Sequence, residues 1–265
     1  MPAPATAQET SGGAYIKIGW RRRYVIESLM ERHLAGFSGE RLLDVGPGYN
    51  HFGRLAARII GARDVTYIDC DEDVLSWQIA ECGKRGVEAK GMLIPLERSA
   101  LGGLAERYDL ILCQEVLEHL GNAEEVLAAL AKRLAPGGRM VITVPTQRSE
   151  RWLKRLNPNY MKNDPHGHVR EFDEQGLREL MRGAGLRPVV FLPTQPHALV
   201  AHTLIFGTRM RIEESTGRIL TGGIRGFASR KLSKLSKGLF CATGPEWWGR
   251  LLPRNYFVVA VKNGS

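Results

Sequence analysis

Strand-like and helix-like segments alternate along most of this 265-residue chain, and this alternation restricts the fold more than any other feature. Short apolar or β-branched runs are separated by stretches with helical periodicity. The expected strands are RLLDV (41–45), DVTYID (64–69), VEAKGMLI (87–94), YDLILC (108–113), RMVITVP (139–145), LRPVVFL (186–192) and NYFVVAVK (255–262). The pattern predicts an α/β fold with a doubly wound, mostly parallel sheet and helices on both faces.

The expected helices lie between these strands, and one precedes them. They are residues 51–60, 73–86, 122–135 and 173–185, with the third stopped by PGG at 136–138. Residues 15–37 mix arginines with aliphatic residues, which predicts an amphipathic N-terminal helix. Residues 1–14 are small and nearly uncharged and are expected to be a disordered tail, leaving 15–265 as one domain.

The composition indicates a globular chain, with 43% hydrophobic and 25% charged residues. No apolar stretch approaches the roughly 20 residues that cross a bilayer. The four cysteines, Cys70, Cys82, Cys113 and Cys241, follow no metal-binding or disulfide spacing. They are interpreted as reduced thiols of a cytoplasmic protein.

Positive charge is concentrated near the C-terminus. The whole chain carries a net +9, and residues 194–265 hold 11 Lys and Arg against three acids, a balance of +8. Residues 224–239 interleave lysines and arginines with leucines, which predicts a basic amphipathic helix. That helix could pack on its own domain or guide a phosphate-bearing substrate. Alternatively, residues 224–250, which include Trp247 and Trp248, could bind the anionic lipids at the inner face of the membrane. RNA-binding aromatic motifs are missing, so nucleic acid is the less favoured partner.

Ligands of a parallel α/β sheet bind at the carboxyl ends of its strands, so the residues after each strand are the candidates for function. The first strand is followed by DVGPGYN, in which Gly46 and Gly48 allow a tight turn and a close approach of ligand. A dinucleotide-binding fingerprint would need a third glycine at position 51, but this chain has His51 there, so the fingerprint is not met. The second strand ends in Asp69, whose carboxylate suits ribose hydroxyls, while Asp71 is expected to cap the next helix.

Four motifs in this order, LLDVGPG, YIDCDEDVL, YDLILCQEVLEHL and LAPGGRMVITVP, together resemble the class I S-adenosylmethionine-dependent methyltransferases. The resemblance covers about residues 41–192 and the last strand. It implies a seven-stranded sheet of order 3-2-1-4-5-7-6 with strand seven antiparallel. The basic segment, about 194–254, would then be an insertion between strands six and seven.

The resemblance also implies which residues contact S-adenosylmethionine. They are Asp44, Gly46, Gly48, Asp69, Cys70, Met92, Leu93 and Gln114. Asp44 and the two glycines would border the methionine part, Asp69 would accept from the ribose hydroxyls, and Gln114 would lie beside the sulfonium. Family members often carry an acidic residue after strand three; this chain has KGMLIPL there, so Met92 and Leu93 are expected only to pack against the adenine.

The segment QEVLEHL holds Glu115, Glu118 and His119 at helical spacing, so all three are expected on one helix face. Two carboxylates and an imidazole suit Mg²⁺ or Mn²⁺. The pattern E-x-x-E-H is similar to that of ubiquinone-pathway O-methyltransferases and small-RNA 2′-O-methyltransferases. The RNA enzymes add a histidine after strand five, a role that the resemblance assigns to His168 in PHGHVREF, with His166 as a base or substrate contact.

The alternative is a site without metal, in which these residues order the loop and His168 or His119 is the general base. In either case the expected activity is methyl transfer to a hydroxyl of a sugar, glycan or secondary metabolite, with a small-molecule or lipid-linked glycan acceptor. An RNA 2′-O-methyltransferase and a cofactor-binding scaffold without turnover are the alternative functions.

Overall fold

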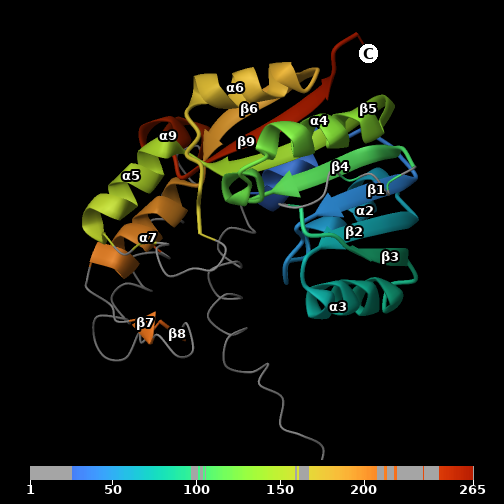
Figure 1. The fold of residues 1–265 in the computed structure, drawn as a ribbon, viewed down its shortest axis with the longest axis horizontal. Coiled ribbons are helices and arrows are strands. Elements are labelled where there is room, and N and C mark those ends of the chain that lie inside the picture. The colour runs from blue at the N-terminus through green and yellow to red at the C-terminus, as the bar shows by residue number, and fades with distance from the viewer. Residues whose placement is uncertain are drawn as a thin grey trace, which may run out of the picture.

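The computed structural model describes residues 26–96, 101, 104, 106–158, 160, 167–207, 212–213, 218–219, 235 and 245–264. Seven strands form one sheet in the order β3-β2-β1-β4-β5-β9-β6 (Figure 1). They are β1 (Arg41–Val45), β2 (Asp64–Asp69), β3 (Glu88–Leu93), β4 (Tyr108–Gln114), β5 (Leu134–Pro145), β6 (Leu186–Thr194) and β9 (Asn255–Lys262). Only β9 pairs antiparallel within this sheet, with β5 and β6. Because β9 is the seventh of these strands along the chain, the predicted order and direction are confirmed.

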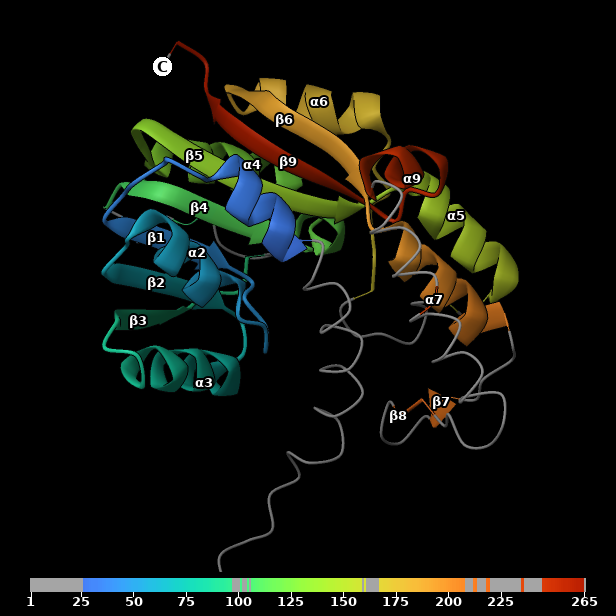
Figure 2. The same cartoon turned by 180° about the vertical axis from the view of Figure 1, so that it is seen from behind.

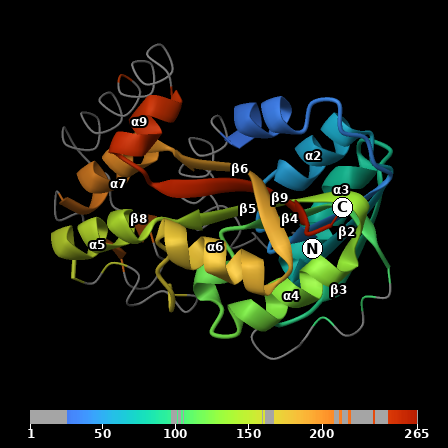
Figure 3. The ribbon, with the colours of Figure 1, turned by 90° about the horizontal axis from the view of Figure 1, so that it is seen from above.

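Helices cover both faces of the sheet (Figure 3). One face carries residues 26–33, α2 (Phe52–Ile60) and α3 (Glu72–Gly83), and the other carries α4 (Ala123–Arg133) and α6 (Glu174–Gly183). Successive residues of β4 alternate between the two resulting cores: Leu110 and Leu112 face the first, Ile111 and Cys113 the second. The continuous apolar run YDLILC is therefore explained by burial on both sides.

The boundary between α4 and β5 differs from the sequence expectation. The helix ends at Arg133, and Leu134 already pairs with Tyr108 before the PGG turn is reached. The register then shifts, and the regular ladder resumes where Arg139 pairs with Leu110. The PGG sequence therefore forms an irregularity within the strand, because it cannot continue an even ladder.

Three further helices gather beyond the carboxyl ends of the strands (Figures 1 and 2). They are α5 (Gln147–Leu156), α7 (Pro196–Gly207) and α9 (Pro245–Leu251), with α7 in contact with both others. Sequence periodicity did not predict α5, which begins after β5 where the Thr146 side chain accepts a hydrogen bond from the Ser149 amide. These helices extend the domain past the edge at which ligands of such sheets bind.

Parts of the chain that carried expectations lie outside the described residues: the N-terminal tail, residues 15–25 of the N-terminal helix, and the basic helix at 224–239 apart from Leu235. Between α7 and α9 the structure describes a short antiparallel pair, β7 (Ile212–Glu213) and β8 (Arg218–Ile219). Within the described part of the chain, no helix is both long and apolar enough to span a bilayer.

Candidate active site

The turn after β1 is a glycine loop held close to the neighbouring strands. Gly46 and Gly48 both have positive φ, 62° and 50°, which favours glycine. The Gly46 amide donates to the Ile68 carbonyl of β2 at 2.8 Å, and a Cβ on Gly46 would lie 2.6 Å from the Val116 side chain. The loop therefore needs glycine for its conformation and for its close packing against the segment after β4.

Gln78 of α3 holds this loop from the side. Its Nε2 donates to the carbonyls of Gly48 at 2.7 Å and Asn50 at 2.8 Å, and its Oε1 accepts from Arg54. The side chain is 1% exposed. Nothing in the sequence singled out Gln78, because its partners lie about 30 residues away in the chain.

Asp44 lies buried beneath the loop, near the end of β1. Burial, and secondarily the Asp69 carboxylate, raise the pKa of Asp44 to about 8. Gly53 donates a backbone hydrogen bond to Asp44, and a Cβ on Gly53 would lie 2.5 Å from Asp44 Oδ2. Among the described residues no group hydrogen-bonds to Oδ2, so a buried acceptor is left for a ligand that brings a donor.

Asp69 ends β2 one strand away. Its carboxylate accepts from the Gly48 amide at 3.4 Å and the Asp71 amide at 3.1 Å, and burial raises its pKa above the ordinary value. The register pairs Ile68 with Met92 and Asp69 with Leu93, so the end of β3 lies at the same edge. Asp71 caps α3 as expected, accepting from two amides of its first turn.

The eight residues assigned to the cofactor thus come from one edge of the sheet. Met92 is half-buried, Leu93 is 56% exposed and Cys70 is exposed. Gln114 ends β4 and is buried, with Nε2 donating to Met30 Sδ at 3.9 Å. In the described structure Gln114 Oε1 accepts no hydrogen bond, which is a second buried acceptor at this edge.

The turn after β4 does not form the helix that the spacing of QEVLEHL predicted. Only Leu117–His119 are helical, as a single 3₁₀ turn, and Glu115 precedes it with φ of 56°. The Glu115 carboxylate instead accepts from Thr143 Oγ1 at 2.9 Å and from Asn255. The expectation of one shared helix face was wrong, because the turn tightens and sends Glu115 toward β5 and β9.

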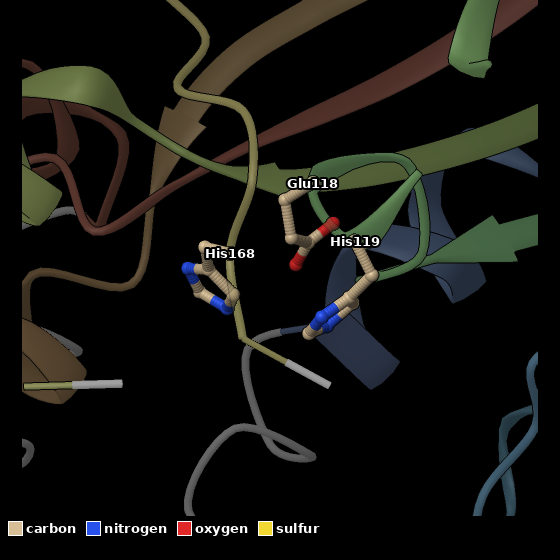
Figure 4. A group of neighbouring side chains, drawn as sticks. All are labelled: Glu118, His119 and His168. Atoms are coloured by element: carbon tan, nitrogen blue, oxygen red, sulfur yellow. The ribbon is translucent and has the colours of Figure 1, made fainter. Parts of the chain in front are cut away.

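Glu118, His119 and His168 do come together (Figure 4). One ligand atom from each lies within 4.8 Å of the others, and Glu118 is 1% exposed. The backbone explains the meeting: the amides of Val169 and Arg170 donate to the Glu118 carbonyl at 2.9 and 3.1 Å. The loop before α6 is thereby fastened to the turn after β4. His166 lies outside the described residues.

This trio fits a divalent cation in its donor types and approximately in its spacing. Ligands about 2.1 Å from one ion lie at most about 4.2 Å apart, so side-chain shifts of a few tenths of an ångström would suffice. Glu115 is not part of the group. One carboxylate and two imidazoles leave coordination positions open for substrate oxygens.

His168 is oriented from behind by Glu150 of α5. Its Nδ1 lies 2.7 Å from Glu150 Oε2, and the Glu150 side chain is fully buried. Although burial acts against the ionised form, the hydrogen bond from His168 and the charge of Arg254 hold the pKa of Glu150 below its ordinary value. Sequence reasoning missed both Glu150 and Arg254, since SERW and PRNY carry no recognisable site pattern.

Comparison with known protein families shows which family the chain belongs to. A methyltransferase-domain family matches residues 18–190, more than half of the chain. The chain belongs to the class I S-adenosylmethionine-dependent methyltransferases. As an S-adenosylmethionine-dependent methyltransferase it is an enzyme, and its family implies S-adenosylmethionine as the methyl donor.

Among curated methyltransferases, the chain is similar to the ubiquinone biosynthesis O-methyltransferase of Aeromonas salmonicida, with 31% identity over 156 residues. That match covers 57% of this chain and 64% of the relative, so the chain spans less than two thirds of the relative's length. This similarity makes the chain a distant relative of O-methyltransferases.

Two solved structures share the fold across nearly the whole chain. A putative methyltransferase from Bacillus halodurans has a TM-score of 0.57 at 15% identity, covering 88% of this chain and 97% of its own. A chain in the complex of the Haloferax volcanii Trm112 methyltransferase activator with a putative methyltransferase has a TM-score of 0.60 at 12% identity, covering 95% of each. At these identities the similarity extends to the methyltransferase fold alone.

Proposed function

We propose that this methyltransferase transfers the methyl group of S-adenosylmethionine to a hydroxyl oxygen held beside Glu118, His119 and His168. The observation that carries the proposal is the convergence of a buried carboxylate and two imidazoles just past the end of β4. That position adjoins Gln114, which the resemblance places beside the sulfonium. The similarity to ubiquinone biosynthesis O-methyltransferases supports an oxygen acceptor.

The cofactor would lie across the ends of β1, β2 and β3. Asp69 would accept from the ribose hydroxyls, since an ionised carboxylate accepts two hydrogen bonds in this geometry. The buried acceptors Asp44 Oδ2 and Gln114 Oε1 would take donors from the methionine part. Met92 and Leu93 would pack against the adenine, at the edge where their strand pairs with β2.

Glu118, His119 and His168 would hold Mg²⁺ or Mn²⁺. Glu115 becomes a fourth ligand only if its carboxylate leaves Thr143 and Asn255. The bound cation would lower the pKa of a coordinated acceptor hydroxyl. An acceptor with two neighbouring hydroxyls fits best, because both oxygens could occupy the open positions and only one would face the methyl group.

In the transfer itself, an acceptor hydroxyl held by the cation would release its proton to solvent, whereas in the alternative without metal His119 or His168 would accept it as general base. The acceptor oxygen then forms a bond to the methyl carbon as the carbon–sulfur bond breaks, leaving S-adenosylhomocysteine and a methyl ether. The proposed acceptor is a hydroxyl of a sugar, a glycan or a natural product. If the acceptor is bound to a membrane, it would be a lipid-linked glycan.

The test separates cofactor binding from metal-dependent transfer. Glu118→Gln and His119→Ala should each lower the turnover of a vicinal-diol or catechol acceptor at least about 100-fold while leaving the Kd for S-adenosylmethionine unchanged. EDTA should abolish turnover and added Mg²⁺ or Mn²⁺ should restore it. Glu124→Gln, which removes an exposed ion pair with Arg170, is the control.

Full activity in EDTA would refute the metal role and leave the general-base alternative. Absence of S-adenosylmethionine binding by calorimetry would refute the enzymatic proposal itself. Methylation of an RNA 3′ end in preference to the small acceptors would instead identify an RNA 2′-O-methyltransferase, and cofactor binding without turnover on any acceptor a scaffold.

A further inference from the structure

A chain of buried polar contacts runs from His168 away from the candidate active site. His168 Nδ1 meets Glu150 Oε2 at 2.7 Å, and Glu150 Oε1 accepts from Arg254 Nη1 at 3.0 Å. The Glu150 and Arg254 side chains are 0% and 3% exposed. Glu150 lies in α5, and Arg254 is the residue just before β9. These two residues are called the buried pair below.

Each side-chain nitrogen and oxygen of the buried pair has a hydrogen-bond partner. Arg254 also donates to Ser149 Oγ at 3.1 Å, to Tyr160 Oη at 3.2 Å and to His202 Nδ1 at 3.2 Å. Tyr160 Oη in turn donates to Glu150 Oε1 at 3.3 Å. A buried ion pair rarely stabilises a fold more than apolar residues of the same volume would, so stability alone does not account for it.

The buried pair determines how His168 is presented. A carboxylate can only accept, so the hydrogen bond to Glu150 requires the proton on Nδ1. The His168 ring is also bounded by the rings of His119, 4.9 Å away between centroids, and Tyr160, 6.5 Å away, both edge-on. Because Glu150 engages Nδ1, Nε2 is the nitrogen left for the group with Glu118 and His119 that Figure 4 shows.

We propose that Glu150 and Arg254 are positioning residues for His168: they hold its proton on Nδ1 and so offer the Nε2 lone pair toward Glu118 and His119. Glu150 supplies the acceptor, and Arg254 fixes that carboxylate in place by donating to its Oε1. A histidine that ligates a metal or accepts a proton through one nitrogen is commonly oriented by a carboxylate on the other. The consequence for catalysis rests on the proposed function, but the tautomer is a property of this chain alone.

The first measurement reads the tautomer directly. In the metal-free protein near pH 8, ¹⁵N spectra of labelled histidine should show His168 protonated on Nδ1 and unprotonated on Nε2, with the signal assigned by its loss in His168→Asn. A proton on Nε2 in the wild-type protein overturns the proposal, whatever the protein's activity.

The second measurement removes the buried pair without leaving a lone buried charge. The double variant Glu150→Leu with Arg254→Met replaces it by apolar side chains, a change that preserves the fold in comparable buried pairs. We expect the Kd for S-adenosylmethionine to stay unchanged, the His168 signal to shift to a mixture of tautomers, and the affinity for Mn²⁺ to fall about 10- to 100-fold. Glu171→Gln is the matched control, because Glu171 pairs with Arg151 and Lys154 on the outer side of α5.

The outcomes keep the two proposals apart. If the wild-type protein binds no divalent cation, the metal part of the proposed function fails, while the positioning role stands on the tautomer and its loss in the double variant. A folded double variant with the wild-type tautomer overturns the positioning role. Should the double variant not fold, Glu150→Asp retains the charge with a shorter arm, and an unchanged His168 spectrum in that variant also overturns it.

Discussion

At the scale of single residues, the two carboxylates Asp44 and Asp69 of the candidate site differ in their burial and in their hydrogen-bond partners. Asp44 is buried, none of the described residues hydrogen-bonds to its Oδ2, and burial raises its pKa to about 8. Asp69 is only half-buried and accepts from two backbone amides, which oppose the effect of burial on its pKa. Asp44 is therefore suited to a partner that brings a positive charge or donors, and Asp69 to neutral hydroxyls.

Asp44→Asn should change the pH dependence of stability in the cofactor-free protein. A raised native pKa means that the folded state binds more protons than the unfolded state between about pH 4 and 8, so Asp44 lowers stability as pH rises through this window. The variant should gain a few degrees in Tm over wild type at pH 8 and little at pH 4, measured by thermal denaturation. Asp64→Asn, at the opposite end of β2, is the control; a difference that does not depend on pH would contradict the prediction.

At the scale of elements, the glycine loop depends on α3 as much as on β1. Gln78 satisfies two loop carbonyls from a helix whose first turn is capped by Asp71, so the loop and that helix form one unit. The sequence indicated the loop and the helix separately. The connection between them is the buried side-chain amide of Gln78, a residue that cannot be told apart from other helical residues in the sequence.

Gln78→Leu should loosen the loop. Two backbone carbonyls would lose their partner, which costs about 1–3 kcal/mol for buried groups. We expect a lower free energy of unfolding in urea and a roughly 10-fold higher Kd for S-adenosylmethionine by calorimetry. Gln175→Leu changes the same residue type on the exposed face of α6 and should leave both values near wild type. An unchanged cofactor affinity in Gln78→Leu would show that the loop keeps its conformation without the hydrogen bonds from Gln78.

At the scale of the whole molecule, α5, α7 and α9 form a layer beyond the strand ends (Figure 2). The exposed side chains of this layer include charged and large apolar ones. Trp152, Trp247 and Leu251 are 45%, 57% and 45% exposed. Trp152 and Leu251 also line a cavity of about 690 Å³ with arginines of α5. Aromatic and basic side chains in this combination are typical of surfaces that meet anionic lipid.

The membrane expectation from the sequence, placed on residues 224–250, can be tested on this described surface. We expect the full-length protein to co-sediment with vesicles containing phosphatidylglycerol, less so with phosphatidylcholine alone, and to be released by about 0.5 M salt because screening weakens exposed charges. Trp247→Ala combined with Leu251→Ala should reduce binding several-fold. Binding that is the same with neutral vesicles, or absent from both, would contradict a membrane role for this face.

Much of this protein follows from its sequence alone. Runs such as DVTYID and NYFVVAVK match β2 and β9 to the residue, because both are rich in β-branched and aromatic residues, which favour strands, and the middle of each run is buried within the sheet. The strand-end rule and the methyltransferase motifs are sufficient to predict that Asp44, Asp69 and Gln114 share one edge of the sheet. These features depend on neighbours in the chain, which the sequence displays.

Other features were decided only by the tertiary structure. Glu118 meets His168 because the loop before α6 hydrogen-bonds to the turn after β4, while Glu115 turns away to Thr143 and Asn255. Glu150 meets Arg254 although 104 residues separate them. Periodicity specifies which side of an element faces the core, but contacts between loops and helix ends depend on how the elements pack, and no local pattern encodes that packing.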